Sequence, residues 1–531
     1  MDHAHEIARR RTFAIISHPD AGKTTLTEKL LLYGGALHMA GAVKSRKATR
    51  HAISDWMSIE QERGISITSS VLQFDHEGYR LNLLDTPGHA DFSEDTYRTL
   101  AAVDGAVMLI DVAKGVEDRT KRLFEVCRLR NMPIITFVNK MDRPGRDPID
   151  LMDEVQKLLK IGVVPLNWPI GQGSEFIGVL DRLTMNVHVY EKVDAGAAVA
   201  TEKIAPLHSD EAKRLLGDRW AEVNESAELI EAAGDPWSVE AFLKGQVTPF
   251  FFGSAMSNFG VAPLLRAIEA LMPKPLPRET VQGERRPEDA DFAAFVFKIQ
   301  ANMNPKHRDR IAFMRVVSGK FERGMEVRLA RTGKTLRMNK PHTFLAAERS
   351  IVEEAVPGDI VGLYDPGELR IGDTLSTGAP VVFQGIPRFA PEFFARVRLK
   401  DPMRRKQLQD GLMQLSQEGT VQLFFREGLG AADPYLGAVG MLQFEVLKVR
   451  LEQEYNVKVE LETSRYTAAR WIGGAASGRD WLDGRSDFAV VTDRDGRPVV
   501  LAETGWSLQY ATQEAKGLIL YDVSPLGGPE S

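Results

Sequence analysis

The segment Ser17-His18-Pro19-Asp20-Ala21-Gly22-Lys23-Thr24-Thr25 decides the fold class of the first part of this chain. It follows a short apolar run at 12–16 and precedes an apolar helical pattern at 26–32. A turn from a buried strand into a helix points successive backbone N–H groups at one place, and the helix N-terminus adds partial positive charge. The segment therefore predicts a phosphate-binding loop, in which Lys23 reaches the β and γ phosphates and the Thr24 hydroxyl binds Mg²⁺.

Ser17 stands where the general form of this motif has its first glycine, and Gly-Lys-Thr before a helix can also be an ordinary turn. Three further segments favour the phosphate site. Each ends an apolar run and so lies at the carboxyl end of a predicted strand, where open α/β sheets bind their ligands. They are Asp85-Thr86-Pro87-Gly88-His89, Asn139-Lys140-Met141-Asp142 and Gly253-Ser254-Ala255. The Asp85 carboxylate is expected near the metal, and the Gly88 N–H near the γ-phosphate.

Asp142 indicates which base the site prefers. A fixed carboxylate accepts hydrogen bonds from the ring N–H and the exocyclic amine of guanine, whereas adenine offers no such pair of donors. A mismatch that leaves such a group unpaired discriminates by about 10⁴-fold. The alternative, that Asp142 only caps the following helix, is less favoured because the other segments are present. We therefore expect GTP and GDP to be bound by residues 17–25, 85–89, 139–142, 254 and 255.

Length, charge and cysteine count exclude several classes of protein. The chain has 531 residues, enough for three to four domains at roughly 150 residues each. Hydrophobic residues make up 43% and charged residues 26%, and the net charge of −6 argues against coating nucleic acid through global charge. The single cysteine, Cys127, excludes an intramolecular disulfide framework and cysteine-rich zinc modules, and we expect it to be a buried hydrophobic residue. With no signal peptide and no apolar run near the roughly 18 residues that span a membrane, we expect a cytoplasmic protein.

The order of predicted elements indicates an α/β fold followed by two further domains. Short apolar runs alternate with helical patterns from 11 to 142, which is typical of a mostly parallel sheet covered by helices on both faces. We expect a first domain at 1–278 with an insertion at about 145–248, and a Pro-rich, charged linker at 279–290. Many short alternating runs predict a β-barrel at 291–384. Strands and helices then alternate at 385–531, which predicts an α+β, ferredoxin-like domain with a C-terminal extension.

The four loop segments, taken with Glu62-Arg63-Gly64-Ile65-Ser66-Ile67-Thr68, resemble the guanine-nucleotide motifs of the translational GTPases, the group that contains elongation factors Tu and G. The resemblance implies that Ser66 ligates Mg²⁺ from the first switch loop together with Thr24 and Asp85, with Thr68 as a less favoured ligand. It also implies that His89 is the catalytic residue that orients the attacking water. We find no convincing internal arginine finger, so intrinsic hydrolysis should be slow and depend on an outside activator.

The resemblance extends beyond the first domain. Residues 310–319 resemble the translation-factor β-barrel, and residues 389–392 resemble the opening of the third domain of elongation factor G. Residues 17–25, 54–57, 63–67 and 437–446 are similar to those of class II release factors. This implies a ribosome-dependent GTPase that promotes dissociation and recycling of class I peptide release factors after peptide release. The implied partners are the ribosome, including its RNA, the class I factors and GTP or GDP, with no membrane, and we expect a monomer.

Two other functions remain open at this level. One is a shortened elongation or ribosome-protection type of translational GTPase, and the other is a binding module that holds GTP only as a structural ligand. A local basic cluster gives separate support for RNA contact, although a solvated charged face explains it equally well. Its members are Arg396, Arg398, Lys400, Arg404, Arg405 and Lys406.

Overall fold

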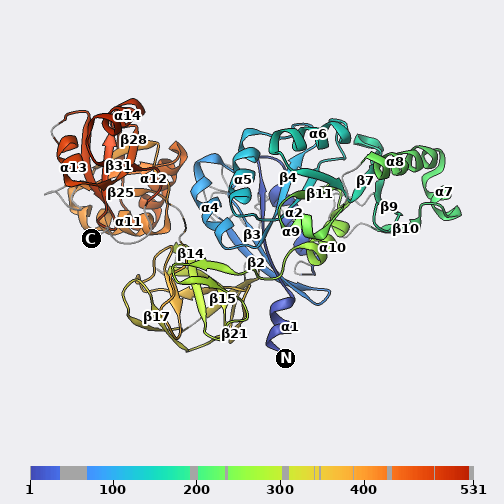
Figure 1. Ribbon diagram of the computed structural model, residues 1–531, viewed down its shortest axis with the longest axis horizontal. Coiled ribbons are helices and arrows are strands. Elements are labelled where there is room, and N and C mark those ends of the chain that lie inside the picture. Colours follow the sequence, from blue (N-terminus) through green and yellow to red (C-terminus); the bar gives the residue numbers. More distant parts are fainter. Residues whose placement is uncertain are drawn as a thin grey trace.

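A computed structural model describes residues 2–35, 69–191, 201–233, 237–301, 310–339, 341–345, 348–384, 386, 388–426, 433–483 and 485–524. Three units follow one another along the chain, and a small subdomain projects from the first unit at the end of the molecule away from the C-terminal unit (Figure 1). The first unit is a P-loop α/β fold, the second a β-barrel and the third an α+β unit, which confirms the predicted fold class.

The first unit is built on a seven-stranded sheet with the order β2-β3-β1-β4-β5-β11-β6. Only β2 runs antiparallel to its neighbour. The strands are β1 (Arg10–Ser17), β2 (Ser70–His76), β3 (Tyr79–Asp85), β4 (Gly105–Asp111), β5 (Ile134–Asn139), β6 (Gly162–Pro165) and β11 (Val247–Phe252). Strands β1, β4 and β5 are buried along their whole length, as the apolar runs predicted.

Helices cover both faces of this sheet. One apolar core joins it to α4 (Ser93–Ala101), α5 (Asp118–Leu129) and α6 (Pro148–Leu159). A second core joins it to α2 (Lys23–Tyr33) and α10 (Val261–Leu271). Cys127 lies fully buried in the first core, where burial raises the pKa of its thiol to about 12. A short helix, α1 (His3–Ala8), precedes β1.

The projecting subdomain has its own four-stranded antiparallel sheet, with the order β10-β9-β8-β7. Its strands are β7 (Asn167–Ile170), β8 (Gly178–Asp181), β9 (Asn186–Tyr190) and β10 (Glu202–Pro206), packed against α7 (Asp210–Leu216) and α8 (Trp220–Ala233). The chain returns through α9 (Val239–Leu243) to β11 of the main sheet. Within the range 145–248, α6 and β6 pack with the main sheet, so the separate fold is made of the elements that follow them.

The second unit begins after a short hairpin, β12 (Arg278–Thr280) with β13 (Gly283–Arg285). Its main sheet has eight strands in the order β18-β17-β23-β14-β15-β22-β19-β20 around one apolar core. The strands are β14 (Ala293–Ala301), β15 (Arg310–Ser318), β17 (Glu326–Leu329), β18 (Thr335–Arg337), β19 (Pro341–Leu345), β20 (Glu348–Ile351), β22 (Ile360–Tyr364) and β23 (Thr374–Ser376), with β16 (Phe321–Glu322) paired to β21 (Glu354–Ala355).

The third unit contains two successive βαββαβ motifs that share one eight-stranded sheet. The first consists of β24 (Phe393–Leu399), α11 (Arg405–Glu418), β25 (Gln422–Arg426), β26 (Tyr435–Ala438), α12 (Met441–Tyr455) and β27 (Val459–Thr463). The second consists of β28 (Ala468–Gly474), α13 (Ala476–Asp483), β29 (Phe488–Asp493), β30 (Pro498–Ala502), α14 (Gly505–Glu514) and β31 (Leu518–Tyr521). Pairing of β25 with β29 joins them. The expected C-terminal extension is therefore a second complete motif.

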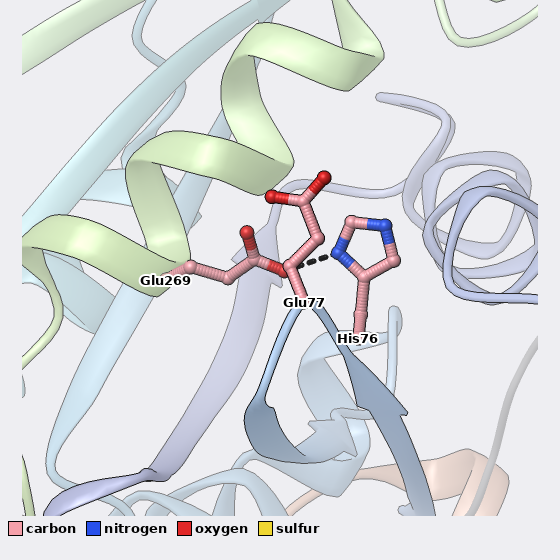
Figure 2. Close-up of side chains that lie close together, drawn as sticks. All are labelled: His76, Glu77 and Glu269. Atoms are coloured by element: carbon pink, nitrogen blue, oxygen red, sulfur yellow. Dashed lines mark hydrogen bonds and ion pairs between the residues drawn. The ribbon is translucent and has the colours of Figure 1, made fainter.

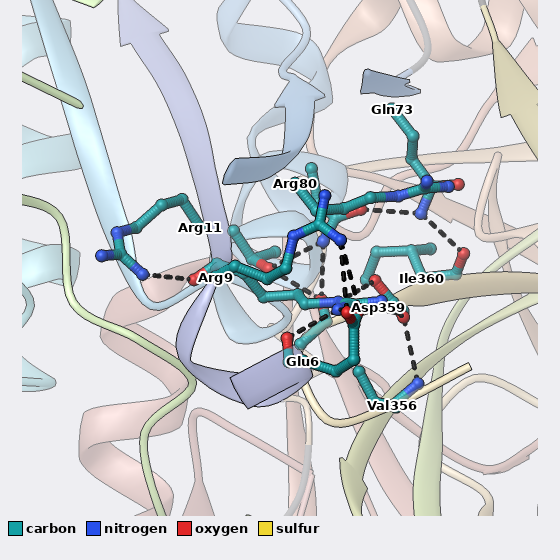
Figure 3. A network of polar contacts seen from close by, with 12 residues as sticks. Glu6, Arg9, Arg11, Gln73, Arg80, Val356, Asp359 and Ile360 are labelled. Atoms are coloured by element: carbon teal, nitrogen blue, oxygen red, sulfur yellow. Dashed lines mark hydrogen bonds and ion pairs between the residues drawn. The ribbon is translucent and has the colours of Figure 1, made fainter. Parts of the chain in front are cut away.

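A buried polar network fastens the first unit to the barrel (Figure 3). Arg10 Nε donates to the Asp359 carboxylate at 3.2 Å, and Gln73 Nε2 donates to the carbonyl of Ile360 at 3.1 Å. The carbonyl of Gly358 accepts from Thr12 Oγ1 at 2.7 Å and from Asn82 Nδ2 at 3.0 Å. Because these groups are buried, the contact orients the barrel against strands β1, β2 and β3.

In the part of the chain that the structure describes, no helix is both long enough and apolar enough to cross a membrane.

Candidate nucleotide-binding site

The four predicted loops meet at one edge of the main sheet, and Asn139 ties three of them together. Asn139 Nδ2 donates to the carbonyl of Ala21 at 2.8 Å, and its Oδ1 accepts from the Ala255 amide at 2.9 Å. Gly22 has φ +96°, and a Cβ added there would overlap the Asn139 amide group. The glycine is therefore needed both for its left-handed backbone and for this close approach.

Lys23 and Asp85 face each other inside the site. The Lys23 Nζ forms a hydrogen-bonded ion pair with Asp85 Oδ1, and both side chains are buried. Thr86 Oγ1 donates to the carbonyl of Ile15 at 2.7 Å, which fixes the start of the second loop to β1. A buried ammonium and a carboxylate at the carboxyl ends of adjacent strands are the groups that a phosphate and its metal require.

The Lys140 side chain is hydrogen-bonded to the predicted phosphate-binding loop. Its backbone has φ +69°, and its Nζ donates to the Asp20 carbonyl at 2.5 Å and to Asp111 Oδ2 at 2.7 Å. Burial raises the pKa of Asp111, but hydrogen bonds from Lys140 and from the Ala113 amide outweigh burial and hold the pKa below its usual value. Our sequence interpretation missed Asp111, although it ends β4 at the same edge of the sheet.

Asp142 is held by the last loop. Its Oδ1 accepts a hydrogen bond from Ser254 Oγ at 2.6 Å, and Ser254 Oγ in turn accepts from the Ser257 amide at 3.3 Å. The Met141 amide donates to the Gly253 carbonyl at 3.1 Å. The carboxylate is thus kept in one orientation, as base recognition requires, and Ser254 orients it without removing its remaining acceptor sites.

His18 and Ser17 occupy the start of the phosphate-binding loop. Ser17 Oγ donates to the His18 carbonyl at 2.9 Å, an interaction that the usual glycine cannot make. The His18 ring is buried, with Nδ1 2.6 Å from the Pro19 carbonyl and 2.9 Å from the Glu117 carboxylate. Burial lowers the pKa of His18 despite that carboxylate.

His89 lies at the rim of the site. Its side chain is 40% exposed, and its Nδ1 is 3.2 Å from the Asp91 amide, which donates to it. Arg119 Nη2 donates to the Pro87 carbonyl at 3.0 Å and so holds the turn that precedes His89. Burial lowers the pKa of Arg119 to about 10. Sequence patterns did not single out Arg119, because its role comes from a contact between α5 and a distant loop.

Thr24 and Asp85 supply the hydroxyl and the carboxylate oxygens that Mg²⁺ prefers, and they stand at the start of α2 and at the end of β3. Their chemistry therefore fits the predicted metal. Ser66, Thr68, the whole 62–68 segment and residues 54–57 lie outside the described residues.

A second cluster with possible metal ligands lies elsewhere. The ligand atoms of His76, Glu77 and Glu269 are within 4.8 Å of one another, and His76 Nδ1 contacts Glu269 at 2.5 Å (Figure 2). This cluster is at the β2–β3 turn, and strand pairing places that turn beside the start of β1. It is therefore at the opposite edge of the sheet from the nucleotide loops and is explained as an ion pair between the hairpin and α10.

Three members of the basic cluster, Arg396 and Arg398 on β24 and Lys400 directly after it, are paired with acidic side chains. Arg396 forms an ion pair with Asp433, Arg398 Nε contacts Glu462 at 3.1 Å, and Lys400 Nζ contacts Glu460 at 2.9 Å. Glu460 and Glu462 belong to the neighbouring strand β27. These pairs favour the interpretation of a solvated charged face and weaken the case that this strand contacts RNA.

Each of the three units matches a known family model, in the same order along the chain. Residues 8–274 match the elongation factor Tu GTP binding domain, residues 291–378 match elongation factor G domain 2, and residues 383–512 match the C-terminal domain of the class II release factor RF3. A crystal structure of a Thermus thermophilus protein shares the fold with a TM-score of 0.69 at 24% identity, over 88% of this chain and 70% of that one.

Curated relatives match over nearly the full length. Peptide chain release factor 3 of Symbiobacterium thermophilum is 54% identical over 521 residues, which cover 97% of this chain and 98% of the relative. The proteins of the same name from Acaryochloris marina and Gloeobacter violaceus are 51% and 50% identical, each over 98% of this chain and over 97% and 99% of the relative.

Proposed function

The chain belongs to the peptide chain release factor 3 family, and from that premise we propose that it uses GTP on the ribosome to drive class I release factors off after peptide release. Its role as a GTPase of translation termination follows from the family itself. The proposal adds activation by the ribosome, the class I factor as the partner displaced, and cytoplasmic action as a monomer. A shortened elongation or ribosome-protection factor is not favoured, because the relatives that match end to end are release factors.

The convergence of the loops around Asn139 is the single observation that carries this proposal. The Asn139 side chain is hydrogen-bonded both to the loop before Lys23 and to the loop that contains Ala255. Three residues later in the chain, Asp142 is hydrogen-bonded to Ser254. The converging loops therefore offer a buried ammonium for phosphates and a fixed carboxylate for guanine. Residues 17–25, 85–89, 139–142, 254 and 255 bind the nucleotide in this proposal.

Catalysis in the proposal needs little covalent help from the protein. His89 positions the attacking water, and the Lys23 ammonium exchanges its contact with Asp85 for the phosphate oxygens, whose charge it neutralises. Thr24, Asp85 and Ser66 would hold Mg²⁺. Mg²⁺, when bound, neutralises charge that develops on the phosphate oxygens. Loss of the γ-phosphate then changes the loops that carry these residues, and with them the affinity for the ribosome.

Phosphate release measured with and without ribosomes tests the proposal. Wild type should hydrolyse GTP slowly alone and much faster with ribosomes. His89→Ala should lower the stimulated rate by about 100-fold or more, because only the positioning of water is lost, and it should leave GDP affinity near wild type.

His208→Ala is the matched control, because His208 is exposed in the projecting subdomain. It should behave as wild type. Loss of nucleotide binding in His89→Ala would remove His89 from catalysis, and wild-type hydrolysis that ribosomes do not accelerate would reject ribosome activation.

A further inference from the structure

Asp91 stands between His89 and the C-terminal unit. It lies in a short 3-10 helix, Ala90–Phe92, that begins directly after His89. Its backbone amide donates to His89 Nδ1 at 3.2 Å, and its Oδ1 lies 3.3 Å from the same ring nitrogen. With Nδ1 engaged by Asp91, Nε2 is the ring nitrogen left for a water molecule.

The other carboxylate oxygen of Asp91 serves the third unit. Asp91 Oδ2 accepts a hydrogen bond from the Leu442 amide at 2.7 Å, in the first turn of α12. Helix N-termini leave their first amides without backbone partners, and a carboxylate there is favourable both as an acceptor and through the helix dipole. The chain thus supplies a cap for α12 from a residue 351 positions earlier.

Gly440, the N-cap residue of α12, leaves the space that the Asp91 carboxylate occupies. Its φ of −147° is open to any residue, so its backbone does not explain the glycine. A Cβ added at Gly440 would overlap the Asp91 carboxylate. By contrast, α14 is capped by its own Thr504, whose Oγ1 accepts from the Ser507 amide at 3.1 Å. The glycine at 440 is therefore required by the approach of Asp91.

The residues that follow Asp91 hold the same unit at two further points. The Tyr97 ring packs on the Phe389 ring, with centroids 4.9 Å apart. A Cβ added at Gly419, at the end of α11, would overlap the Arg98 guanidinium. The C-terminal unit thus packs against the segment that leads from His89 into α4. Of the contacts in this segment, the one made by Asp91 is nearest to His89 in the chain.

We propose that Asp91 is a positioning residue that couples His89 to α12: its backbone amide holds the His89 ring and its carboxylate holds the first turn of α12, so that the placement of the histidine and the docking of the C-terminal unit depend on one residue. The inference rests on the proposed function, which assigns water positioning to His89. When α12 leaves Asp91, the helix loses its cap and the 3-10 helix whose amide holds the His89 ring loses an anchor. When nucleotide moves the segment 85–92, Asp91 moves with it and its contact with α12 changes.

Two substitutions break this contact from opposite sides. Asp91→Ala removes the carboxylate, and Gly440→Ala displaces it by a substitution made in the third unit alone. Each should raise the hydrogen-exchange rate of the Leu442 amide by roughly tenfold, the range expected for loss of a helix cap. Each should lower the kcat of ribosome-stimulated hydrolysis by about tenfold with little change in the KM for GTP, because the residues proposed to bind the nucleotide are unchanged.

Further variants separate coupling from a merely structural role. Asp91→Asn keeps an acceptor of the same shape and should restore Leu442 protection and most of the turnover. The double variant Asp91→Ala/Gly440→Ala should be no worse than either single variant, because both remove one interaction. Gly505→Ala is the matched control, since an added Cβ at this helix start meets no atom within 4 Å.

Wild-type turnover in Gly440→Ala despite faster Leu442 exchange would overturn the proposal, and so would losses that multiply in the double variant. A failure of the proposed function shows separately, as wild-type hydrolysis that ribosomes do not accelerate. The same variants are then compared in intrinsic single-turnover hydrolysis, where the coupling predicts the same order of rates and equal rates would reject it.

Discussion

The base selectivity that we propose for Asp142 depends on a neighbouring residue as much as on the charge of Asp142. Ser254 Oγ fixes one of its oxygens at 2.6 Å, so the carboxylate presents a constant acceptor pattern. The residues of the four loop segments could be predicted from sequence, because each segment directly follows an apolar run that forms a buried strand. Asp111, Arg119 and Asp91 could not, because each acts through a partner far away in the chain: Lys140, Pro87 and Leu442.

Asp142→Asn should change the preferred base from guanine to xanthine. The variant amide donates where the carboxylate accepted, so guanine meets a mismatch and the 2-oxo group of xanthine gains a partner. GTP affinity should fall by about 100-fold or more, and XTP should bind better than GTP in a competition titration. Ser254→Ala is the companion variant and should weaken GTP binding while guanine stays preferred. An unchanged preference for guanine in Asp142→Asn would contradict the assigned contact.

The elements of the first unit were largely predictable because their apolar patterns are local. The predicted strand at 12–16 lies inside β1, and the helix predicted to follow Lys23 is α2. The second βαββαβ motif was not predictable in the same way. Its helices α13 and α14 are short, and its place in the fold depends on pairing of β25 with β29, whose register is a long-range property.

The turn between β1 and α2 gives a prediction at this scale. Gly22→Ala should lower affinity for GDP by about tenfold more than Gly35→Ala, measured by titration with a fluorescent nucleotide. Both glycines have positive φ, so both variants incur the left-handed backbone cost, but only the Cβ at 22 overlaps Asn139. Equal losses in the two variants would show that backbone strain alone matters and that the contact between the loops does not.

Across the whole molecule, Gly358 is the point at which the barrel is fastened to the first unit. Its carbonyl accepts from Thr12, Asn82 and Arg315, and its φ is +103°. A Cβ added there would lie 2.7 Å from Pro275 Cγ and 2.9 Å from Arg10 Cβ. The order of units was predictable from composition and linkers, but this contact was not, because a Gly in a barrel turn has no pattern that marks an interface.

Gly358→Ala should therefore destabilise the molecule by about 2 kcal/mol more than Gly372→Ala, a barrel glycine with φ +92° and open space at its Cβ. Calorimetry should show the first unfolding transition lowered by a few degrees in Gly358→Ala. Proteolysis between residues 272 and 290 should also become faster. Coincident melting of the two variants would mean that the overlap is relieved without loss and that the interface does not depend on close contact at Gly358.

In the proposed function, GTP bound between these loops makes the molecule displace a class I release factor from the ribosome. The most direct measurement is dissociation of a labelled class I factor from ribosomes whose peptide has just been released. We expect wild type with GTP to accelerate departure of the factor, whereas wild type without nucleotide and Asp142→Asn with GTP should not. Acceleration that is equal with and without GTP would contradict it.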